Sequence, residues 1–178
     1  MDYHAFYAAL FRPIEKGIGP IDPNGIFAIM GFDGGGPLNF STVGAEDGRE
    51  FVTYVSCELA VRNEQVPSSQ GRFELMCHCN DEGWVRRVLT AIGRMSLEAA
   101  FDHGHTVELS KLTVSESSLR GLVIERYAAV IIDDTQYALL RVHGITSEEL
   151  EFAMSEGSEA LFERLKAAGI YPNTDVRR

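Results

Sequence analysis

The apolar residues at the start of the chain recur every three or four positions, which is the pattern of an amphipathic helix. They run from Tyr3 to Ile14, include four aromatic rings, and follow Asp2, a residue type that favours the N-cap position. Pro13 has no backbone N–H to donate, and its ring clashes with the preceding turn. We therefore expect this helix to end near Arg12 or to kink there.

Three further apolar segments of the first half predict strands. They are residues 26–30, 51–61 and 72–79, and turns rich in glycine, proline and serine follow the first and separate the last two. Because side chains alternate between the faces of a strand, the third segment should present two different faces. Phe73, Leu75, Cys77 and Cys79 form one face, and Glu74, Met76 and His78 form the other. We expect the second and third strands to pair antiparallel.

The middle of the chain predicts a helix followed by a hairpin. Asp81 can cap a helix that extends to Arg94 and carries an apolar stripe on one side, so we expect this helix to pack on the sheet. The strands predicted after it are residues 107–109, 122–124, 128–132 and 137–142. Asp133 and Asp134 separate the last two of these strands, and this arrangement is typical of a hairpin.

The C-terminal part predicts two consecutive helices. Thr146 and Glu149, three positions apart, form a capping box, and Gly157 interrupts the helix that this box opens. A second helical segment follows over residues 158–168. Together, the elements predict an α+β fold in which a mixed, largely antiparallel sheet is covered by the 81–94 helix and by the C-terminal helix pair.

The composition narrows the class of protein. The 178 residues are 45% hydrophobic and 24% charged, values typical of a globular chain that can bury a core without disulfides or a structural metal, and we expect one domain over residues 1–178. No apolar stretch approaches the roughly 20 residues of a membrane helix. Three cysteines, an odd number, favour free thiols in a reducing compartment. Because no basic region precedes an apolar run at the N-terminus, we expect a cytoplasmic protein without a secretory signal.

The charge balance indicates the kind of partner. There are 26 acidic and 16 basic residues, which gives a formal net charge of −10. This charge opposes binding to nucleic acid and to anionic membranes, and it favours a basic partner. Eight acidic positions form a solvated surface, which is the commoner role of such residues, or alternatively a binding surface. They are Glu46, Asp47, Glu50, Glu148, Glu149, Glu151, Glu156 and Glu159. Such a surface would attract a basic partner and increase the rate at which it associates.

Several short segments of the second half stand in a characteristic order. They are Phe73-Glu74-Leu75, the helix that carries Trp84, Gly104-His105-Thr106-Val107, residues 140–150, Gly157, residues 161–165 and Thr174-Asp175-Val176-Arg177-Arg178. In this order and spacing, over roughly residues 51 to 178, they resemble the suppressor of fused domain family. Members of that family occur in animals as a Hedgehog-pathway regulator and in many bacteria as short single-domain proteins.

The resemblance implies the fold of one suppressor of fused lobe and a protein-binding function. Animal members clasp a transcription-factor peptide as an added strand between two lobes, whereas bacterial members are proposed to be immunity proteins that neutralise delivered toxins. Animal members carry an acidic residue where this chain has His105, so we do not expect their peptide specificity to transfer. Six residues within the matching segments are expected to contact the partner: Glu74, His105, Glu148, Glu149, Asp175 and Arg177.

Three groups of residues suggest catalytic or metal chemistry but have a simpler structural interpretation. Cys77-His78-Cys79 contains the residue types that bind zinc, yet an extended strand sends the histidine to the face opposite both cysteines. His103 and His105 share one turn and have no further ligand at a suitable spacing. Asp133 and Asp134 suit a hairpin turn better than a pair of catalytic carboxylates.

We therefore predict a protein-binding module that is not an enzyme and has no metal and no cofactor. The most concrete form of this prediction is an immunity-type protein that blocks a toxin by direct binding. Two alternatives stay open. One is a regulatory adaptor that binds an extended partner peptide by strand addition. The other is a metal-dependent enzyme in which His103, His105, Asp133 and Asp134 converge in one cleft.

Overall fold

The computed structural model describes residues 2–46, 48–109 and 117–178. Its strands form one sheet in the order β1-β2-β3-β4-β7-β6-β5. The strands are β1 (Asp22–Ile26), β2 (Phe40–Val43), β3 (Val52–Ser56), β4 (Arg72–Cys79), β5 (Thr106–Glu108), β6 (Gly121–Ile132) and β7 (Thr135–Ile145). Neighbouring strands pair antiparallel except β4 and β7, which pair parallel. The predicted mixed, largely antiparallel sheet is confirmed.

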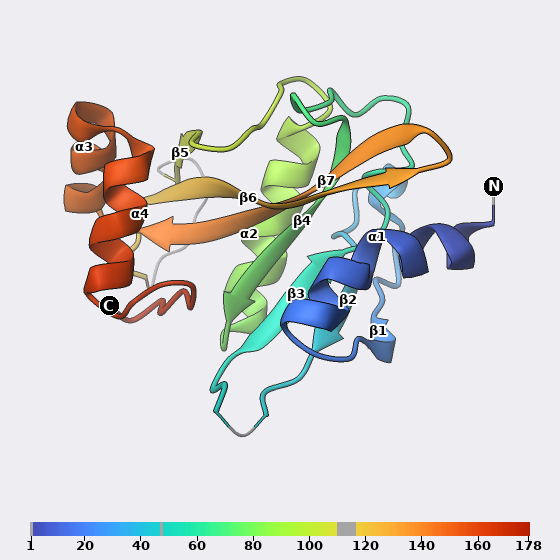
Figure 1. Cartoon of the computed structure of the whole chain (residues 1–178), viewed down its shortest axis with the longest axis horizontal. Helices are drawn as coiled ribbons and strands as arrows, with labels where there is room; N and C mark the ends of the chain where they lie inside the picture. The colour runs from blue at the N-terminus through green and yellow to red at the C-terminus, as the bar shows by residue number, and fades with distance from the viewer. Residues whose placement is uncertain (1, 47, 110–116) are drawn as a thin grey trace.

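The helices cover both faces and one end of this sheet (Figure 1). They are α1 (Tyr3–Gly17), α2 (Glu82–Met95), α3 (Ser147–Glu156), α4 (Ser158–Ala167) and the short 3-10 helix η1 (Phe32–Gly34). Figure 1 shows α3 and α4 at the end of the sheet that carries β5, opposite the tip of the β6–β7 hairpin. In the part of the chain that the structure describes, no helix is long and apolar enough to span a membrane.

The two faces of β4 bury different side chains, as alternation predicts. Phe73 and Leu75 pack in one core cluster with Trp84 of α2, whereas Met76 packs in another with Leu10 of α1. The pairing of β3 with β4 is antiparallel, as expected. The helix α1 therefore covers the sheet face opposite α2, a position that the sequence did not reveal.

The helices α3 and α4 lie on the same face as α1, at the other end of the sheet. Val123 of β6 packs with Leu161 and Phe162 of α4, while its neighbours Leu122 and Ile124 join the cluster that contains α2. Since neighbouring residues of a strand point to opposite faces, α2 and α4 cover different faces. The predicted coverage by the 81–94 helix and the C-terminal helix pair is confirmed.

The first alternative for this helix, an end near Arg12, is wrong, because α1 continues through Pro13 to Gly17. The second, a kink at this point, stays a prediction. A proline removes one hydrogen bond from a helix. Here the apolar stripe continues past it: Ile14 is completely buried among the residues that join α1 to the sheet. This burial offsets the missing hydrogen bond.

The strands predicted at residues 26–30 and 51–61 differ from those observed. The first lies earlier, at β1, and Phe27, Ile29 and Met30 are exposed by 65%, 109% and 58%. These three apolar side chains are therefore not part of a hydrophobic core. The second is shorter, since β3 ends at Ser56 and the chain then turns, with Arg62 N–H donating to the carbonyl of Leu59.

Two of the later local signals are confirmed, and one is wrong. Asp133 and Asp134 have positive φ angles of 46° and 60°, the backbone of a type I′ hairpin turn. The prediction of separate strands at residues 122–124 and 128–132 is wrong, because both belong to one strand, β6, with an irregularity between Arg126 and Ala128. The capping box is formed: Glu149 N–H donates to Thr146 Oγ1 (3.3 Å), and Thr146 N–H donates to Glu149 Oε2 (2.8 Å).

A buried carboxylate fastens α1 to the sheet. Glu74 of β4 has no exposed surface; its Oε1 accepts from the hydroxyl of Tyr7 on α1 (3.0 Å) and from Ala60 N–H (2.8 Å), and its Oε2 accepts from Ser56 Oγ. Burial raises the pKa of Glu74 to about 7, although these hydrogen bonds favour the charged form. The carboxyl group is therefore partly protonated at neutral pH.

The C-terminal tail continues the sheet where β4 and β7 separate. Their paired positions end at Met76 opposite Arg141. Beyond this point, Thr174 N–H donates to the carbonyl of His78 (2.8 Å), and Gly144 N–H donates to Thr174 Oγ1 (3.1 Å). The tail thus lies next to both strands and satisfies backbone groups that their separation would leave without partners.

The close approach of the tail to β7 requires a glycine, so we expect Gly144→Ala to destabilise the protein. A methyl group at this position would lie 2.4 Å from Leu119 Cδ1 and 2.9 Å from Thr174 Cγ2. Overpacking of this kind lowers the free energy of unfolding by about 1–3 kcal/mol, which urea unfolding followed by circular dichroism can measure. The control is Gly44→Ala, where a methyl group meets nothing within 4 Å. Equal stability of the two variants would show that the tail leaves room for a methyl group on β7.

The raised pKa of Glu74 predicts a pH-dependent stability. The folded state holds the proton more tightly than the unfolded state, whose pKa is near 4.5, so the stabilisation present below that pH is lost as the pH rises through about 7. We expect the free energy of unfolding of the native protein, relative to Glu74→Gln, to fall between about pH 5 and about pH 8, by at most ~1.4 kcal/mol per pH unit.

Urea titrations of both proteins at the two pH values measure this difference. Other titrating groups occur in both proteins and therefore cancel. A difference in stability that stays constant with pH would show that Glu74 is already ionised in the folded state.

Candidate functional site

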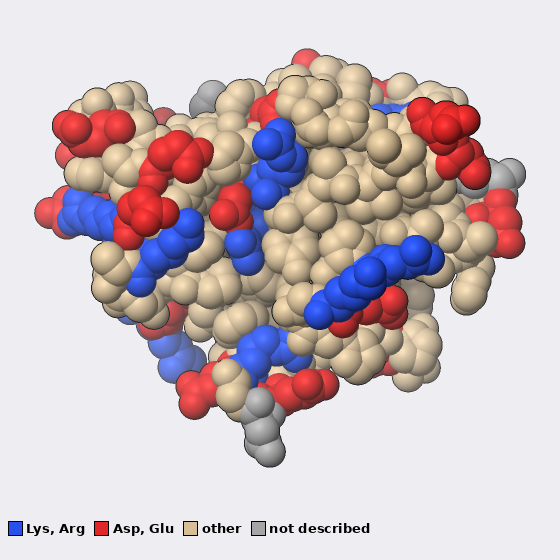
Figure 2. All heavy atoms as spheres, in the orientation of Figure 1, with Lys and Arg blue, Asp and Glu red and all other residues tan. Residues whose placement is uncertain are grey.

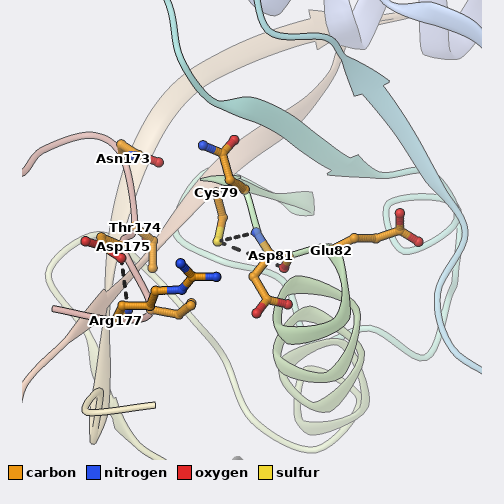
Figure 3. Close-up of a pocket in the computed structure, with 9 residues that line it drawn as sticks. Cys79, Asp81, Glu82, Asn173, Thr174, Asp175 and Arg177 are labelled. Atoms are coloured by element: carbon orange, nitrogen blue, oxygen red, sulfur yellow. Dashed lines mark hydrogen bonds between the residues drawn. The ribbon is translucent and has the colours of Figure 1, made fainter. Parts of the chain in front are cut away.

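A groove runs between the C-terminal tail and the junction of β4 with α2 (Figure 3). It has a volume of about 580 Å³. Two segments that are far apart in the sequence form its walls: Cys79, Asn80, Asp81 and Glu82 on one side, and Asn173, Thr174, Asp175, Val176 and Arg177 on the other. We call this feature the tail groove.

The first wall is fixed by the start of α2. Asp81 is the N-cap of this helix, as predicted, and its Oδ1 accepts from Trp84 N–H (2.8 Å). The Sγ of Cys79 accepts from Asp81 N–H (3.3 Å), and Figure 3 shows this contact at the edge of the groove. The carboxylate of Asp81 is therefore held by local bonds before any ligand arrives.

The second wall is fixed by the tail. Thr174 is buried and bonded to β4 and β7, as described above, while Asp175 and Arg177 on either side of Val176 are exposed. Asp175 Oδ1 accepts from Arg177 N–H (2.9 Å), which stabilises the turn between them. In Figure 3 the guanidinium group of Arg177 extends from the tail toward the wall that carries Cys79.

The lining of the tail groove is acidic. Its lining includes three carboxylates, on Asp81, Glu82 and Asp175, and one cationic side chain, Arg177, and all four residues are exposed. In Figure 3 the side chain of Glu82 points away from the tail. Burial raises the pKa of Cys79 to about 11, so this residue is a protonated thiol at neutral pH and a weak nucleophile. The groove is thus suited to hold a cationic group.

Of the six residues expected to contact a partner, the structure brings together Asp175 and Arg177. His105 and Glu148 are exposed elsewhere, on the turn before β5 and on the first turn of α3. Glu74 and Glu149 do not form an accessible surface: Glu74 is completely buried beneath α1, and Glu149 is only 8% exposed.

Glu149 instead joins the end of the chain to α3. Its Oε1 and Oε2 accept from the guanidinium group of Arg178 at 2.7 and 2.9 Å, and Oε2 also completes the capping box. Both side chains of this ion pair are largely buried. Glu149 therefore holds the C-terminal tail against α3, and it is not accessible to a partner.

The acidic positions gather on α3 and α4 more than elsewhere, and Figure 2 shows red side chains over these helices with blue ones between them. Arg164 and Lys166 of α4 are also exposed. The exposed carboxylates are Glu148, Glu151, Glu156, Glu159 and Glu163. We call this feature the acidic helical face. Met154 lies within it and is 76% exposed. Glu46 and Glu50 belong to the separate segment between β2 and β3, and Asp47 lies outside the described residues.

The cysteine–histidine segment of β4 has the geometry that argues against zinc. Cys77 and Cys79 face the α2 side of the sheet, while His78 lies on the other side, where its Nδ1 is 2.8 Å from Thr53 Oγ1 and its Nε2 accepts from Arg141 Nη1 (3.2 Å). Burial and the nearby Arg141 lower the pKa of His78 to about 3. His78 is therefore a neutral structural side chain.

The residues of the metal-dependent alternative do not converge. Arg126 N–H donates to His103 Nδ1 (3.1 Å), whereas Asp133 lies seven positions farther along the hairpin, a separation of about 23 Å in an extended strand. Within residues 2–46, 48–109 and 117–178, no group of three or more histidine, cysteine, aspartate or glutamate side chains is placed to hold a metal ion. That alternative is wrong in the form predicted.

The sequence identified Asp81 only as a helix cap and gave no sign of the groove beside it. A local sequence pattern does not reveal the groove, because the groove forms only when the tail pairs with the end of β4, and these two segments are far apart in the chain. The residues of the tail itself were identified through the family resemblance.

The fold matches proteins of known structure. A chain in the Sufu-Fu complex crystal structure has a TM-score of 0.66 and 17% sequence identity, over 99% of this chain and 91% of that chain. The crystal structure of Drosophila Suppressor of Fused has a TM-score of 0.56 and 16% identity over 72% of this chain, which spans 38% of the length of that one. No curated protein sequence matches closely enough to count as a relative.

The family comparison extends the resemblance that the sequence indicated. Residues 34–178 match the family described as suppressor of fused protein (SUFU). The match begins before residue 51, the approximate start of the resemblance seen in the sequence, and it includes both walls of the tail groove. Because this match covers most of the sequence and the fold agrees with two suppressor of fused structures, the chain belongs to the suppressor of fused family.

Proposed function

We propose that this chain is a non-catalytic protein-binding module of the immunity type, which neutralises a toxin by direct binding and receives a basic side chain of that toxin in the tail groove. The observation that carries this proposal is the groove lining of three exposed carboxylates and one arginine. Membership of the suppressor of fused family supports a role in protein interaction, since a related chain was crystallised in the Sufu-Fu complex.

The tail groove is suited to an arginine or a lysine of the partner. Charge-assisted hydrogen bonds between a cation and carboxylates are among the stronger polar contacts. Asp81 and Asp175 are held by bonds to the backbone N–H groups of Trp84 and Arg177, so little conformational freedom is lost when a ligand binds. A volume of about 580 Å³ leaves room for a long side chain and its neighbours.

The acidic helical face would support this contact from a distance. Exposed charges of one sign increase the rate at which an oppositely charged partner associates. Met154, exposed by 76% among these carboxylates, offers an apolar contact, and methionine is enriched at protein interfaces. A basic toxin would meet both an attractive field and a place to bury an apolar group.

An adaptor that receives a peptide by strand addition is less well supported. The gap between β4 and β7 is already filled by the tail, with Thr174 bonded to both strands. The edges of the described sheet are β1 and β5; β1 contains Pro23, which has no N–H to donate, and β5 has only three residues.

The proposal predicts that removing carboxylates from the tail groove weakens binding to the native partner. That partner is identified by co-purification with the tagged protein from its host. We expect the double variant Asp175→Asn and Glu82→Gln to raise the dissociation constant by about tenfold, because two attractive charges are lost. Titration calorimetry measures the effect, and a higher salt concentration should reduce the difference between the two proteins.

A control with the same charge change is Glu15→Gln with Glu64→Gln, at exposed positions outside the groove; its dissociation constant should stay within about twofold of the native value. The immunity function is tested separately by expressing the partner alone and with this chain. Growth arrest that this chain relieves is the expected result. A partner without toxicity would contradict the immunity function, and equal weakening in both double variants would contradict the groove.

A further inference from the structure

The outer face of α2 carries a second groove, which is lined by cationic side chains, whereas the lining of the tail groove is acidic. The volume of the second groove is about 480 Å³, and its lining residues are Pro37, Gly83, Arg86, Arg87, Thr90, Ala91 and Arg94. The opposite side of α2, with Trp84, Val88 and Ile92, is buried against the sheet. We call this feature the arginine groove.

The spacing of the residues on α2 gives the groove its shape. Gly83, Arg87 and Ala91 follow one another at four-residue intervals, and Arg94 comes three positions later, so these residues lie along one side of the helix. Ala91 separates the two long arginine side chains and leaves a small apolar floor between them. Such a groove can accept a side chain between two cations.

The opposite wall is bound to α2 by hydrogen bonds. Leu38 N–H donates to Thr90 Oγ1 (3.1 Å), and Arg94 Nη2 donates to the carbonyls of Gly35 and Gly36. Thr90 and Leu38 are both buried. The wall is therefore fixed in place without a ligand.

The arginines of this groove make few direct contacts with carboxylates, although Asp81 Oδ1 and Arg87 Nη1 both lie near Gly83, at 3.4 and 3.5 Å from the position that a methyl group there would take. Arg86 has one carboxylate nearby, that of Glu82 at 3.4 Å, and Arg94 binds carbonyl groups. Among the described residues, no carboxylate lies within 4 Å of the guanidinium group of Arg87, and Arg87 is exposed. The arginine groove is therefore locally cationic, although the chain as a whole has a net charge of −10.

An exposed apolar side chain, that of Met30, lies next to the glycine segment 34–36 to which Arg94 is bound. Met30, which is 58% exposed, has its Cγ 3.4 Å from the position that a methyl group on Gly34 would take. Gly34 directly precedes Gly35, whose carbonyl accepts a hydrogen bond from Arg94. Phe27 and Ile29, also exposed, belong to the same segment. An occupant of the groove can therefore contact both cations and an apolar surface.

We propose that the arginine groove binds an acidic segment of a partner protein, in which carboxylate side chains alternate with apolar ones. Guanidinium groups bind carboxylates through paired hydrogen bonds, and the apolar side chains of the segment would lie against Met30 and Ala91. The net charge of −10 opposes a long polyphosphate chain such as nucleic acid. This inference does not depend on the tail groove, which has the opposite charge.

The test uses a short fluorescein-labelled peptide of glutamate, aspartate and leucine, and a second peptide in which glutamine and asparagine replace the acids. Fluorescence anisotropy with the full chain should show saturable binding of the acidic peptide and weaker binding of the neutral one. The double variant Arg86→Gln and Arg87→Gln should raise the dissociation constant about fivefold or more, because the peptide loses two guanidinium groups that attract its carboxylates.

The matched control is Arg12→Gln with Lys16→Gln, which removes the same charge from exposed positions of α1, on the other face of the sheet; it should change the dissociation constant by less than about twofold. Circular dichroism verifies that each variant is folded. No saturable binding to the native chain, or equal weakening in both double variants, would overturn the proposal. A duplex DNA that displaces the acidic peptide at the same charge concentration would also overturn it and assign the groove to phosphate.

Discussion

The tail groove depends on the separation of β4 and β7. These strands pair in parallel only as far as Met76 and Arg141, and beyond that point buried backbone groups need other partners. Thr174 provides them, since its N–H donates to the carbonyl of His78 and its hydroxyl accepts from Gly144 N–H. The tail is thereby held beside the end of β4, which places its exposed side chains across from the start of α2.

The two faces of the sheet are stabilised in different ways. The α2 face is an apolar core that contains Trp84, whereas the α1 face buries polar groups among its apolar contacts. Glu74 accepts three hydrogen bonds there, and His78 contacts Thr53 and Arg141. Buried polar groups are costly unless they are paired. The position of α1 is therefore specified by hydrogen-bond partners as well as by shape.

Periodicity predicted the elements whose signals are local, and it was less informative where contacts are distant. The capping box at Thr146 and the hairpin turn at Asp133 follow from their own neighbours, and both are confirmed. Alternation correctly predicts that Glu74 and Phe73 lie on opposite faces of β4. The family resemblance implies that Glu74 contacts a partner, and the sequence does not show that α1 covers its face and buries it. The segment around Phe27 has the apolar composition of a strand, yet Phe27 is exposed and joins no core. Burial is a property of the whole fold, which a local pattern does not contain.

The net charge of −10 determines the electric field that a partner meets far from the chain. The helix α2 shows that individual surfaces can carry a different local charge. The helix dipole favours acids at the first turn and bases near the last, and α2 follows this rule with Glu82 and Arg94. Its beginning therefore lines the acidic tail groove, and its outer face lines the arginine groove. Salt screens the overall charge beyond about 8 Å. Within that distance, the residues of each groove decide which charge a partner meets.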